Sequence, residues 1–240
     1  SPPPAAAGTA LSATRRLVVA TGITNVWRTP AAQAAAETAG LSTRYPGRFV
    51  LGIGVGHSQA TPEYRRPYAA MVEYLDALDA AAVPAGERVL AALGPRMLRL
   101  STQRAAGAHP YLIPLEHTAR ARALLGPQAL LAPEVNVVLD SDPDTARQAA
   151  RKHLRYYLTL TNYTGNFRRF GFTDADLAGG GSDRLVDALY LWGGVDRIRA
   201  RAGEFYRAGA DHLAVQVVPT HADEPPAARY RALAAALVQA

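Results

Sequence analysis

The chain has 240 residues, of which 49% are hydrophobic and 19% are charged, and its net charge is +6. This composition excludes disorder as the main state and gives enough apolar residues for one large domain or two small ones. The absence of cysteine excludes disulfides, thiol nucleophiles and cysteine-bound metals, and no apolar run approaches the roughly 18 uncharged residues of a membrane span.

Six short apolar runs rich in Val, Ile and Leu are predicted to be strands, and helical stretches separate them. The runs do not alternate between polar and apolar residues, which is typical of strands buried on both faces of a parallel sheet. In chain order the predicted strands are 17–23, 49–55, 88–93, 108–113, 134–139 and 212–218.

Prolines that can occupy a first helical turn precede several of the predicted helices, as Pro30, Pro67 and Pro95 do. The gap between the last two strands is the longest, and it contains an Asn/Gly-rich segment at 161–181 that we expect to be a loop. The predicted helices are 5–14, 30–43, 68–82, 96–106, 116–125, 142–160, 183–192, 196–207 and 226–239. Strands alternating with helices in this way predict one α/β domain with a parallel sheet.

The basic residues are scattered through the predicted helices, and all of them except Lys152 are arginines. No aromatic residues alternate with the arginines to stack bases, so we expect solvated helix faces and no nucleic-acid partner. An anionic cofactor is an alternative explanation for the positive net charge. The segment 1–4 lacks the basic and apolar regions of a signal peptide, so we expect a cytoplasmic protein without membrane association.

The second predicted strand ends in the glycine-rich sequence Gly52-Ile53-Gly54-Val55-Gly56. A dinucleotide-binding fingerprint would open a helix directly and would need an acidic residue at the end of the next strand, and neither is present. Glycines within a strand also permit close approach of a ligand or of another backbone segment. The glycines therefore predict either a ligand surface or tight packing.

His57 follows this strand directly, at the end where active sites of α/β barrels lie. A histidine in this position can exchange a proton near neutral pH. The alternative is a loop histidine that is hydrogen bonded to the backbone.

Two further strand ends carry small or polar residues. The segment from Thr21 to Asn25 could line a ligand, or could form the turn before the helix at Pro30. The turn from Leu93 to Met97 opens a helix whose free N–H groups favour a phosphate, although a plain strand–helix turn is equally compatible.

Ser182 follows three glycines and precedes a predicted helix, so we interpret it as a helix N-cap and not as a nucleophile. The six histidines show no metal-ligand spacing with one another or with acidic residues. The sequence therefore predicts no metal site.

Several stretches together resemble the luciferase-like oxidoreductases, namely TGITN, PGRFVLGIGVGH, RVLAALGPRMLRL, GAHPYLIPLEHTARAR and AGADHLAVQV. The segments GAHPYL and GFTDADLAGGGSDRLVDAL are similar to the subgroup that depends on coenzyme F420, a deazaflavin. The resemblance extends over residues 11–218. It implies a (β/α)8 TIM-type barrel with the cofactor at the C-terminal ends of the strands.

The resemblance also implies roles for particular residues. In relatives, the strand ending like TGITN has a bulge, often with a non-proline cis peptide, that backs the deazaflavin ring. The residue after the GxGxG strand lines the reactive edge of the ring, and the turn after the following strand holds the phosphate. Mapped onto this sequence, the ring would contact Gly22, Ile23, Thr24, Asn25, Gly54, Gly56 and His57, and the phosphate would contact Ala92, Leu93, Gly94, Pro95 and Arg96.

A barrel of this family has eight strands, whereas six are predicted here. We therefore expect strands three to eight in a single barrel domain over residues 1–240, with the first two strands absent at the N-terminal side. The strands at 17–23 and 212–218 would then be open edges, which promote association. We expect these edges to be covered by the termini or by another chain, as in a homo-oligomer, or to be poorly ordered.

The function implied by the resemblance is hydride transfer between coenzyme F420 and a small organic substrate, with His57 as proton donor or orienting group. An FMN-dependent luciferase-like monooxygenase is an alternative, because the same strand ends accept either cofactor. A second alternative is a non-catalytic, incomplete barrel that binds a cofactor or a partner. The substrate cannot be identified, because segment 161–181 has no recognisable chemistry.

Overall fold

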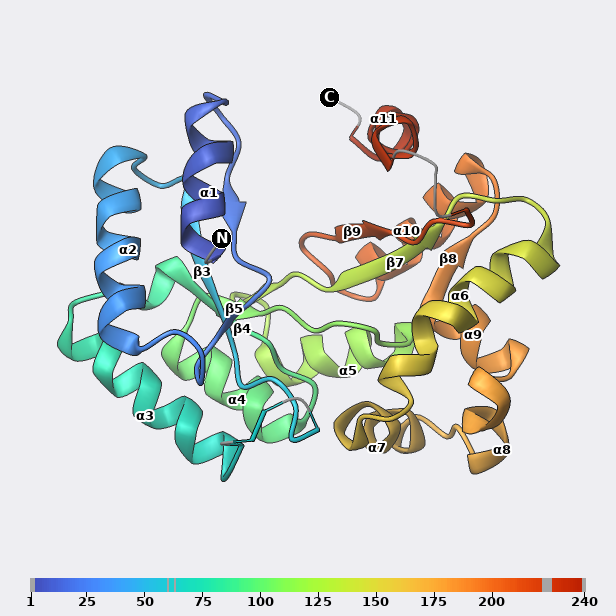
Figure 1. Ribbon diagram of the computed structural model, residues 1–240, viewed down its shortest axis with the longest axis horizontal. Coiled ribbons are helices and arrows are strands. Elements are labelled where there is room, and N and C mark those ends of the chain that lie inside the picture. Colours follow the sequence, from blue (N-terminus) through green and yellow to red (C-terminus); the bar gives the residue numbers. More distant parts are fainter. Residues whose placement is uncertain (1–2, 60, 63, 222–225, 239–240) are drawn as a thin grey trace. The chain divides into compact units, whose positions relative to one another are not determined.

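The computed structural model describes residues 3–59, 61–62, 64–221 and 226–238. The chain divides into two compact units, of which unit 1 is Ser1–His109 with Leu124–Leu130 and unit 2 is Pro110–Ala123 with Leu131–Ala240. Each unit contains parallel strands connected through helices, which confirms the predicted α/β class (Figure 1). The expectation of a single domain stays a prediction.

Unit 1 is built on a sheet with the strand order β1-β3-β4-β5-β6, in which β2 also pairs with β3. Helices α2, α3 and α4 pack on one face of these strands (Figure 1). In chain order the elements are α1 (Pro3–Ser12), β1 (Val19–Ala20), β2 (Thr24–Asn25), α2 (Ala31–Arg44), β3 (Phe49–Gly54), α3 (Pro67–Ala80), a 3₁₀ turn (Ala85–Glu87), β4 (Arg88–Leu90), α4 (Pro95–Arg104), β5 (Gly107–Ala108) and β6 (Leu130–Leu131).

The strands of unit 1 are shorter than the apolar runs that predicted them. The run at 17–23 forms the two strands β1 and β2, and the runs at 88–93 and 108–113 leave the sheet after Leu90 and Ala108. Strand β6 was not predicted. Ala92, Leu112 and Ile113, beyond β4 and β5, are buried by tertiary packing, so they look like strand in the sequence without pairing as one.

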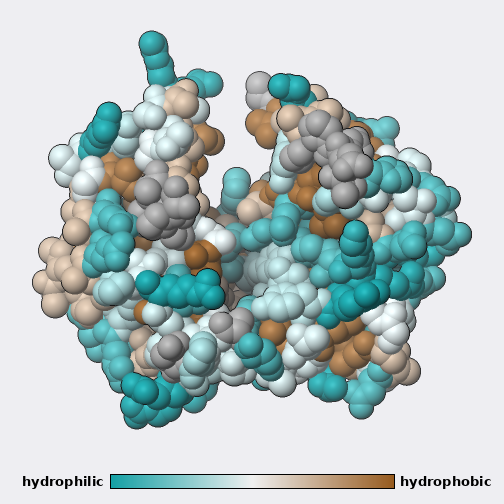
Figure 2. All heavy atoms as spheres, in the orientation of Figure 1, coloured by the Kyte–Doolittle hydropathy of each residue, from teal (hydrophilic) through white to brown (hydrophobic). Residues whose placement is uncertain are grey.

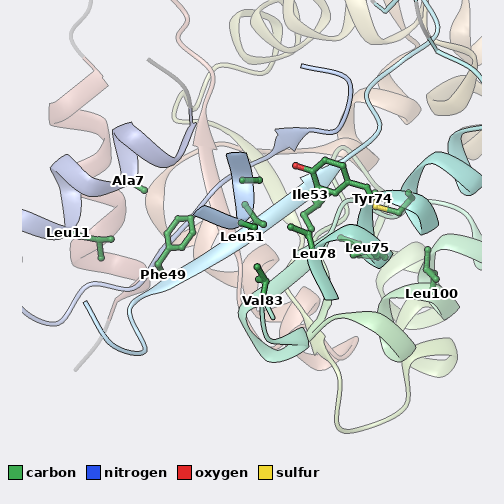
Figure 3. Packing of buried hydrophobic residues seen from close by; sticks show 14 residues of the cluster. Ala7, Leu11, Phe49, Leu51, Ile53, Tyr74, Leu75, Leu78, Val83 and Leu100 are labelled. Atoms are coloured by element: carbon green, nitrogen blue, oxygen red, sulfur yellow. The ribbon is translucent and has the colours of Figure 1, made fainter. Parts of the chain in front are cut away.

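A hydrophobic core anchors β3 in unit 1 (Figure 3). Leu51 and Ile53 are completely buried, as are Leu75 and Leu78 of α3. Burying each such side chain contributes about 1.5–3 kcal/mol. The cluster therefore holds the C-terminal end of β3, where Gly54 leads into His57, in a fixed position within the unit.

Unit 2 is built on a three-stranded parallel sheet with the order β8-β7-β9. Val135, Val137 and Leu191 pack from this sheet against Ile198 and Phe205 of α10. In chain order the elements are α5 (Leu115–Leu125, which ends in unit 1), β7 (Glu134–Val138), α6 (Pro143–Tyr157), α7 (Thr161–Arg169), α8 (Asp174–Leu177), a 3₁₀ turn (Ala178–Gly180), α9 (Asp183–Leu189), β8 (Tyr190–Trp192), α10 (Val195–Arg207), β9 (Ala214–Val217) and α11 (Pro226–Leu237).

Two predictions for unit 2 were wrong. The helix expected at 183–192 ends at Leu189, because Tyr190–Trp192 pairs with β7 as strand β8. The segment 161–181 is not a loop, since α7 and α8 occupy much of it. Buried Tyr163 and Phe167 hold α7 in place despite its Asn/Gly-rich sequence. The predicted last residue of the tail helix, Gln239, lies outside the described residues.

The two sheet edges that were expected to be covered differ in how far other residues of the chain shield them from solvent. Strand β9 lies beside α11, and the Val217 N–H donates to the Tyr230 hydroxyl at 3.3 Å, so the C-terminal helix covers this edge. Next to β1, Leu17 and Val18 are 50% and 54% exposed. Covering of β1 by another chain stays a prediction.

Hydrophilic side chains are spread over the molecular face seen in Figure 2, with hydrophobic patches between them. This distribution agrees with arginines on solvated helix faces. None of the helices in the described part of the chain is long and apolar enough to cross a membrane.

Candidate functional site

The candidate site lies in unit 1, where the C-terminal ends of neighbouring parallel strands meet. Strand pairing places Asn25 beside Gly54, Ile53 beside Leu90, and Leu90 beside Ala108. The strands β2, β3, β4 and β5 therefore end side by side at one edge of the sheet. The segments 22–25, 54–57, 92–96 and 109 follow from these ends, and we call them the strand-tip site.

Close approach of β1 and β3 explains the first glycine of the GxGxG sequence. A Cβ on Gly52 would lie 1.8 Å from the Thr21 carbonyl oxygen, which no side chain can tolerate. The Thr21 hydroxyl donates to the Gly52 carbonyl at 2.9 Å and accepts from the Gly52 N–H at 2.8 Å. Gly52 is therefore required by the sheet itself.

Gly54 is also explained by packing, because a Cβ there would lie 2.7 Å from Ile23 Cδ1. Gly22 differs from both strand glycines. It is exposed, and a Cβ on it would have only an ordinary contact, at 3.6 Å from His109 Nε2. The open face of this segment is therefore at Gly22, and it fits a flat ring better than the surface of β3 does.

The TGITN segment has the backbone that its resemblance implied, since the peptide bond between Gly22 and Ile23 is cis. Thr24 is completely buried, and its hydroxyl donates to Thr21 Oγ1 at 3.2 Å. Asn25 accepts the Trp27 N–H at 2.9 Å through Oδ1, which is the turn chemistry considered as its alternative role. Thr24 therefore supports the segment, whereas Ile23 and Asn25 remain half-exposed.

The turn after β3 brings Gly56 and His57 next to Asn25. Gly56 has a φ of +64°, and a Cβ there would lie 2.6 Å from Asn25 Nδ2. Only glycine fits this combination of left-handed backbone and close approach. His57 is half-buried directly beyond this turn.

The turn after β4 presents the start of α4. Ala92 is buried, Leu93 and Gly94 are half-buried, and Pro95 begins the helix. No side chain caps the first turn at Gly94, so its N–H groups can receive an anion. The exposed Arg96 lies with its guanidinium 4.2 Å from the centre of the Tyr68 ring, which holds a positive charge beside this turn.

Sequence reasoning missed His109. Its segment was predicted to continue as strand to residue 113, but β5 ends at Ala108 and His109 comes directly after it. Its N–H donates to the Leu90 carbonyl at 2.8 Å, and its ring lies beside Gly22. The signal would have been a histidine close behind a strand end, as for His57, which follows β3 by three residues.

Unit 2 contains a polar network that sequence reasoning also missed. Tyr190, Asn136 and Gln216 are neighbours across β8, β7 and β9, so they share one face of the sheet. The Tyr111 hydroxyl lies 2.9 Å from Gln216 Oε1 and 3.2 Å from Asn136 Oδ1, and His153 Nδ1 lies 2.8 Å from the Tyr190 hydroxyl. Leu112, beside Tyr111, is buried with a φ of +52°. Buried polar groups arranged in this way specify a unique packing of the unit.

Burial controls the acid–base behaviour of this network. It lowers the pKa of His153 below 6.5, although the nearby Glu134 carboxylate opposes this effect. Burial also raises the pKa of Tyr111, Tyr163 and Tyr190. The network therefore consists of neutral hydrogen-bonding groups at neutral pH.

Ser182 is the N-cap of α9, as predicted. Its hydroxyl accepts the Leu185 N–H at 3.1 Å and donates to Asp176 Oδ1 at 2.8 Å. The Thr173 N–H and the Ser182 hydroxyl lower the pKa of Asp176 to about 2. Among the described residues, no group of three or more histidines and acidic residues could hold a metal ion.

The model of the luciferase-like monooxygenase family matches residues 1–212 of the chain. No curated protein sequence matches it significantly. Solved structures with the same fold are distant in sequence.

One such structure is an F420-dependent secondary alcohol dehydrogenase in complex with an F420–acetone adduct, with 15% identity and a TM-score of 0.70 over 90% of this chain and 78% of that one. Another is the coenzyme F420-dependent tetrahydromethanopterin reductase of Methanopyrus kandleri, with 16% identity and a TM-score of 0.65 over 90% and 81%. A third is the oxygenating constituent of 3,6-diketocamphane monooxygenase from a Pseudomonas putida plasmid in complex with FMN, with 17% identity and a TM-score of 0.64 over 96% and 81%. The fold is that of the TIM-type barrels of this family.

Proposed function

Because the chain belongs to the luciferase-like monooxygenase family, we propose that it is an oxidoreductase that transfers a hydride between coenzyme F420 and a small organic substrate. The observation that carries this proposal is the strand-tip site of unit 1. There the open face at Gly22 lies beside His109, and the uncapped start of α4 follows the neighbouring strand β4.

The residues present fit a deazaflavin. Gly22 and Ile23 would back the flat ring, because a Cβ at residue 22 would occupy the space that the ring needs. The N–H groups of Gly94 and Arg96 and the positive charge of Arg96 would hold the phosphate, whereas Pro95 between them has no N–H to donate. When bound, the deazaflavin supplies a carbon centre that accepts or releases a hydride.

The chain's own contribution would be to position the reactants and to move a proton. Hydride transfer to or from carbon changes the charge on the neighbouring substrate oxygen. His57 would donate or accept the proton that relieves this charge, which is chemistry that histidine performs near neutral pH. The buried core around β3 would keep the turn that carries His57 in place during this step.

An FMN-dependent monooxygenase is the second candidate. The family description and the FMN-bound neighbour support it, and the open face at Gly22 would accept either ring system. A non-catalytic cofactor-binding protein is the third candidate. The positive charge beside the α4 turn favours the long anionic tail of F420 over the single phosphate of FMN, and only a test of turnover separates the first candidate from the third.

Difference spectroscopy with each cofactor tests the proposal. We expect a saturable spectral change with F420 at micromolar concentrations and a weaker one with FMN. Tighter binding of FMN would favour the monooxygenase. Binding of F420 without reduction or oxidation of any alcohol, ketone or unsaturated carbonyl compound would favour the non-catalytic alternative.

A further inference from the structure

Trp27 connects the ends of two strands at the strand-tip site. Its backbone N–H donates to Asn25 Oδ1 at 2.9 Å, just beyond β2. Its indole Nε1–H donates to the Val55 carbonyl at 2.7 Å, just beyond β3. Trp27 therefore joins the TGITN segment, through its backbone, to the segment that leads into His57, through its side chain.

The same indole ring also contacts the chain on the other side of His57. The Trp27 and Tyr64 ring centres are 6.2 Å apart, with an angle of 50° between the ring planes. Tyr64 is half-buried, and burial raises the pKa of its phenol. Trp27 thus holds the chain on both sides of His57, at Val55 and at Tyr64.

The turn contains one position of high conformational freedom. Gly56 adopts a φ of +64° and has no side chain, so it has more conformational freedom than any other residue type would have there. His57 comes directly after it. The hydrogen bond of Trp27 to the Val55 carbonyl lies next to the flexible position and restricts it.

We propose that Trp27 is a positioning residue that fixes the Gly56-His57 turn for proton transfer, a role that rests on the proposed function of His57. The contacts are made by the indole N–H and by the aromatic face, so phenylalanine can replace only one of them. Tyrosine and histidine cannot place a donor where the indole Nε1 lies.

The test compares Trp27→Phe with Trp192→Phe. The chain has two tryptophans, and the indole of Trp192 also donates one hydrogen bond, to Asp187 Oδ1 in unit 2 at 2.8 Å. We expect Trp27→Phe to lower kcat on the order of tenfold while the Kd for cofactor changes less than about threefold, because small misplacement of a reacting group is costly. Trp192→Phe should leave kcat unchanged, although both variants lose a donor and should have a lowered Tm.

A second measurement needs no cofactor. The ring-proton NMR signal of His57, assigned by its loss in His57→Ala, should shift in Trp27→Phe and stay in place in Trp192→Phe. Tyr64→Leu, which keeps the indole hydrogen bond, should shift the same signal less and serves if Trp27→Phe does not fold. An unchanged His57 signal in Trp27→Phe and Tyr64→Leu, or an equal loss of kcat in both tryptophan variants, would overturn the proposal. Failure of the wild-type chain to bind either cofactor would instead refute the proposed function and leave the NMR result to decide the role of Trp27.

Discussion

At the scale of single residues, His57 is the first position to test. His57→Ala should lower turnover on the order of 100-fold, since a positioned acid or base contributes about 100- to 10,000-fold. Its effect on the Kd for cofactor should stay within a few-fold, because backbone and glycine contacts would hold the ring. Steady-state kinetics and thermal melts of the same variant separate catalysis from stability.

His212→Ala is the matched control for His57→Ala, because His212 is an exposed histidine in unit 2. It should change neither turnover nor Tm. A lowered Tm with unchanged turnover in His57→Ala would show that His57 is a structural loop histidine, whose lost hydrogen bond costs about 1 kcal/mol.

Gly52 of β3 gives a second prediction at this scale. Gly52→Ala should lower the free energy of unfolding by about 1–3 kcal/mol or more, because its Cβ would lie 1.8 Å from a backbone oxygen that is fixed in the sheet. Gly40→Ala in α2 has nothing within 4 Å of the new Cβ, so it should raise stability by about 0.5–1 kcal/mol. Urea unfolding of both variants and of the wild-type chain measures the two changes in the free energy of unfolding. Equal effects would mean that β1 can move away from β3.

At the scale of elements, the predictions that succeeded depend on local signals. Pro67, Pro95 and Pro143 each stand at the start of a helix, in the place where their missing N–H costs nothing. Strand β7 was predicted within one residue, because its apolar run ends at Asp140 with the helix start at Pro143 close behind. The Ser182 cap was predicted for the same reason, since it depends on the next three residues alone.

The elements that were missed depend on partners far away in the chain. Strand β8 exists because Leu191 and Trp192 pair with Val137 and Val138, and its sequence continues the apolar pattern of α9. His109 and the polar network of unit 2 were missed because their neighbours come from other elements. Asn136, Tyr190 and Gln216 are 54 and 26 positions apart, and the strand register alone makes them adjacent.

The polar network of unit 2 predicts a pH dependence of stability. Burial lowers the pKa of folded His153 below its ordinary value of 6.5, so the unfolded chain takes up the proton first as the pH falls. Stability is therefore full above about pH 6.5 and falls as the pH drops from there through the folded pKa. The titratable neighbours are Tyr111, whose hydroxyl lies 3.4 Å from His153 Nε2, together with Glu134, Tyr157 and Tyr190. The pKa values of the three tyrosines are raised, so the tyrosines do not titrate in this range.

The change to make is His153→Gln, which keeps hydrogen bonding and removes the titration. Free energies of unfolding at pH 7.5 and pH 5.5 should differ more for the wild-type chain than for this variant. The exposed residue His212 provides the control His212→Gln, which should behave like the wild type. If the free energy of unfolding depended on pH in the same way in the wild-type chain and in His153→Gln, His153 would not be the source of the pH dependence.

At the scale of the whole molecule, most of the net charge of +6 lies in unit 1, which has 11 basic and 6 acidic residues, whereas unit 2 has 15 basic and 14 acidic residues. The unit that carries the strand-tip site is therefore the more positive one, and we expect the arginines nearest the strand tips to contribute most to selectivity between anionic cofactors. Arg28 and Arg96 are exposed next to the segments after β2 and β4. The longer, more strongly charged tail of F420 can interact with more of this charge than the single phosphate of FMN.

The last prediction is that salt weakens binding of F420 more than binding of FMN. The Debye length falls from about 10 Å at 0.1 M salt to about 3 Å at 1 M, so exposed charge pairs are screened over this range. The Kd for F420 should rise several-fold and that for FMN by less, as followed by fluorescence titration. Arg96→Gln should weaken F420 binding and reduce its salt dependence, whereas Arg207→Gln, at an exposed arginine of α10 in unit 2, should change neither. Equal affinities for both cofactors, unaffected by salt, would show that charge does not select the cofactor and would leave ring contacts at Gly22 and Ile23 as the source of affinity.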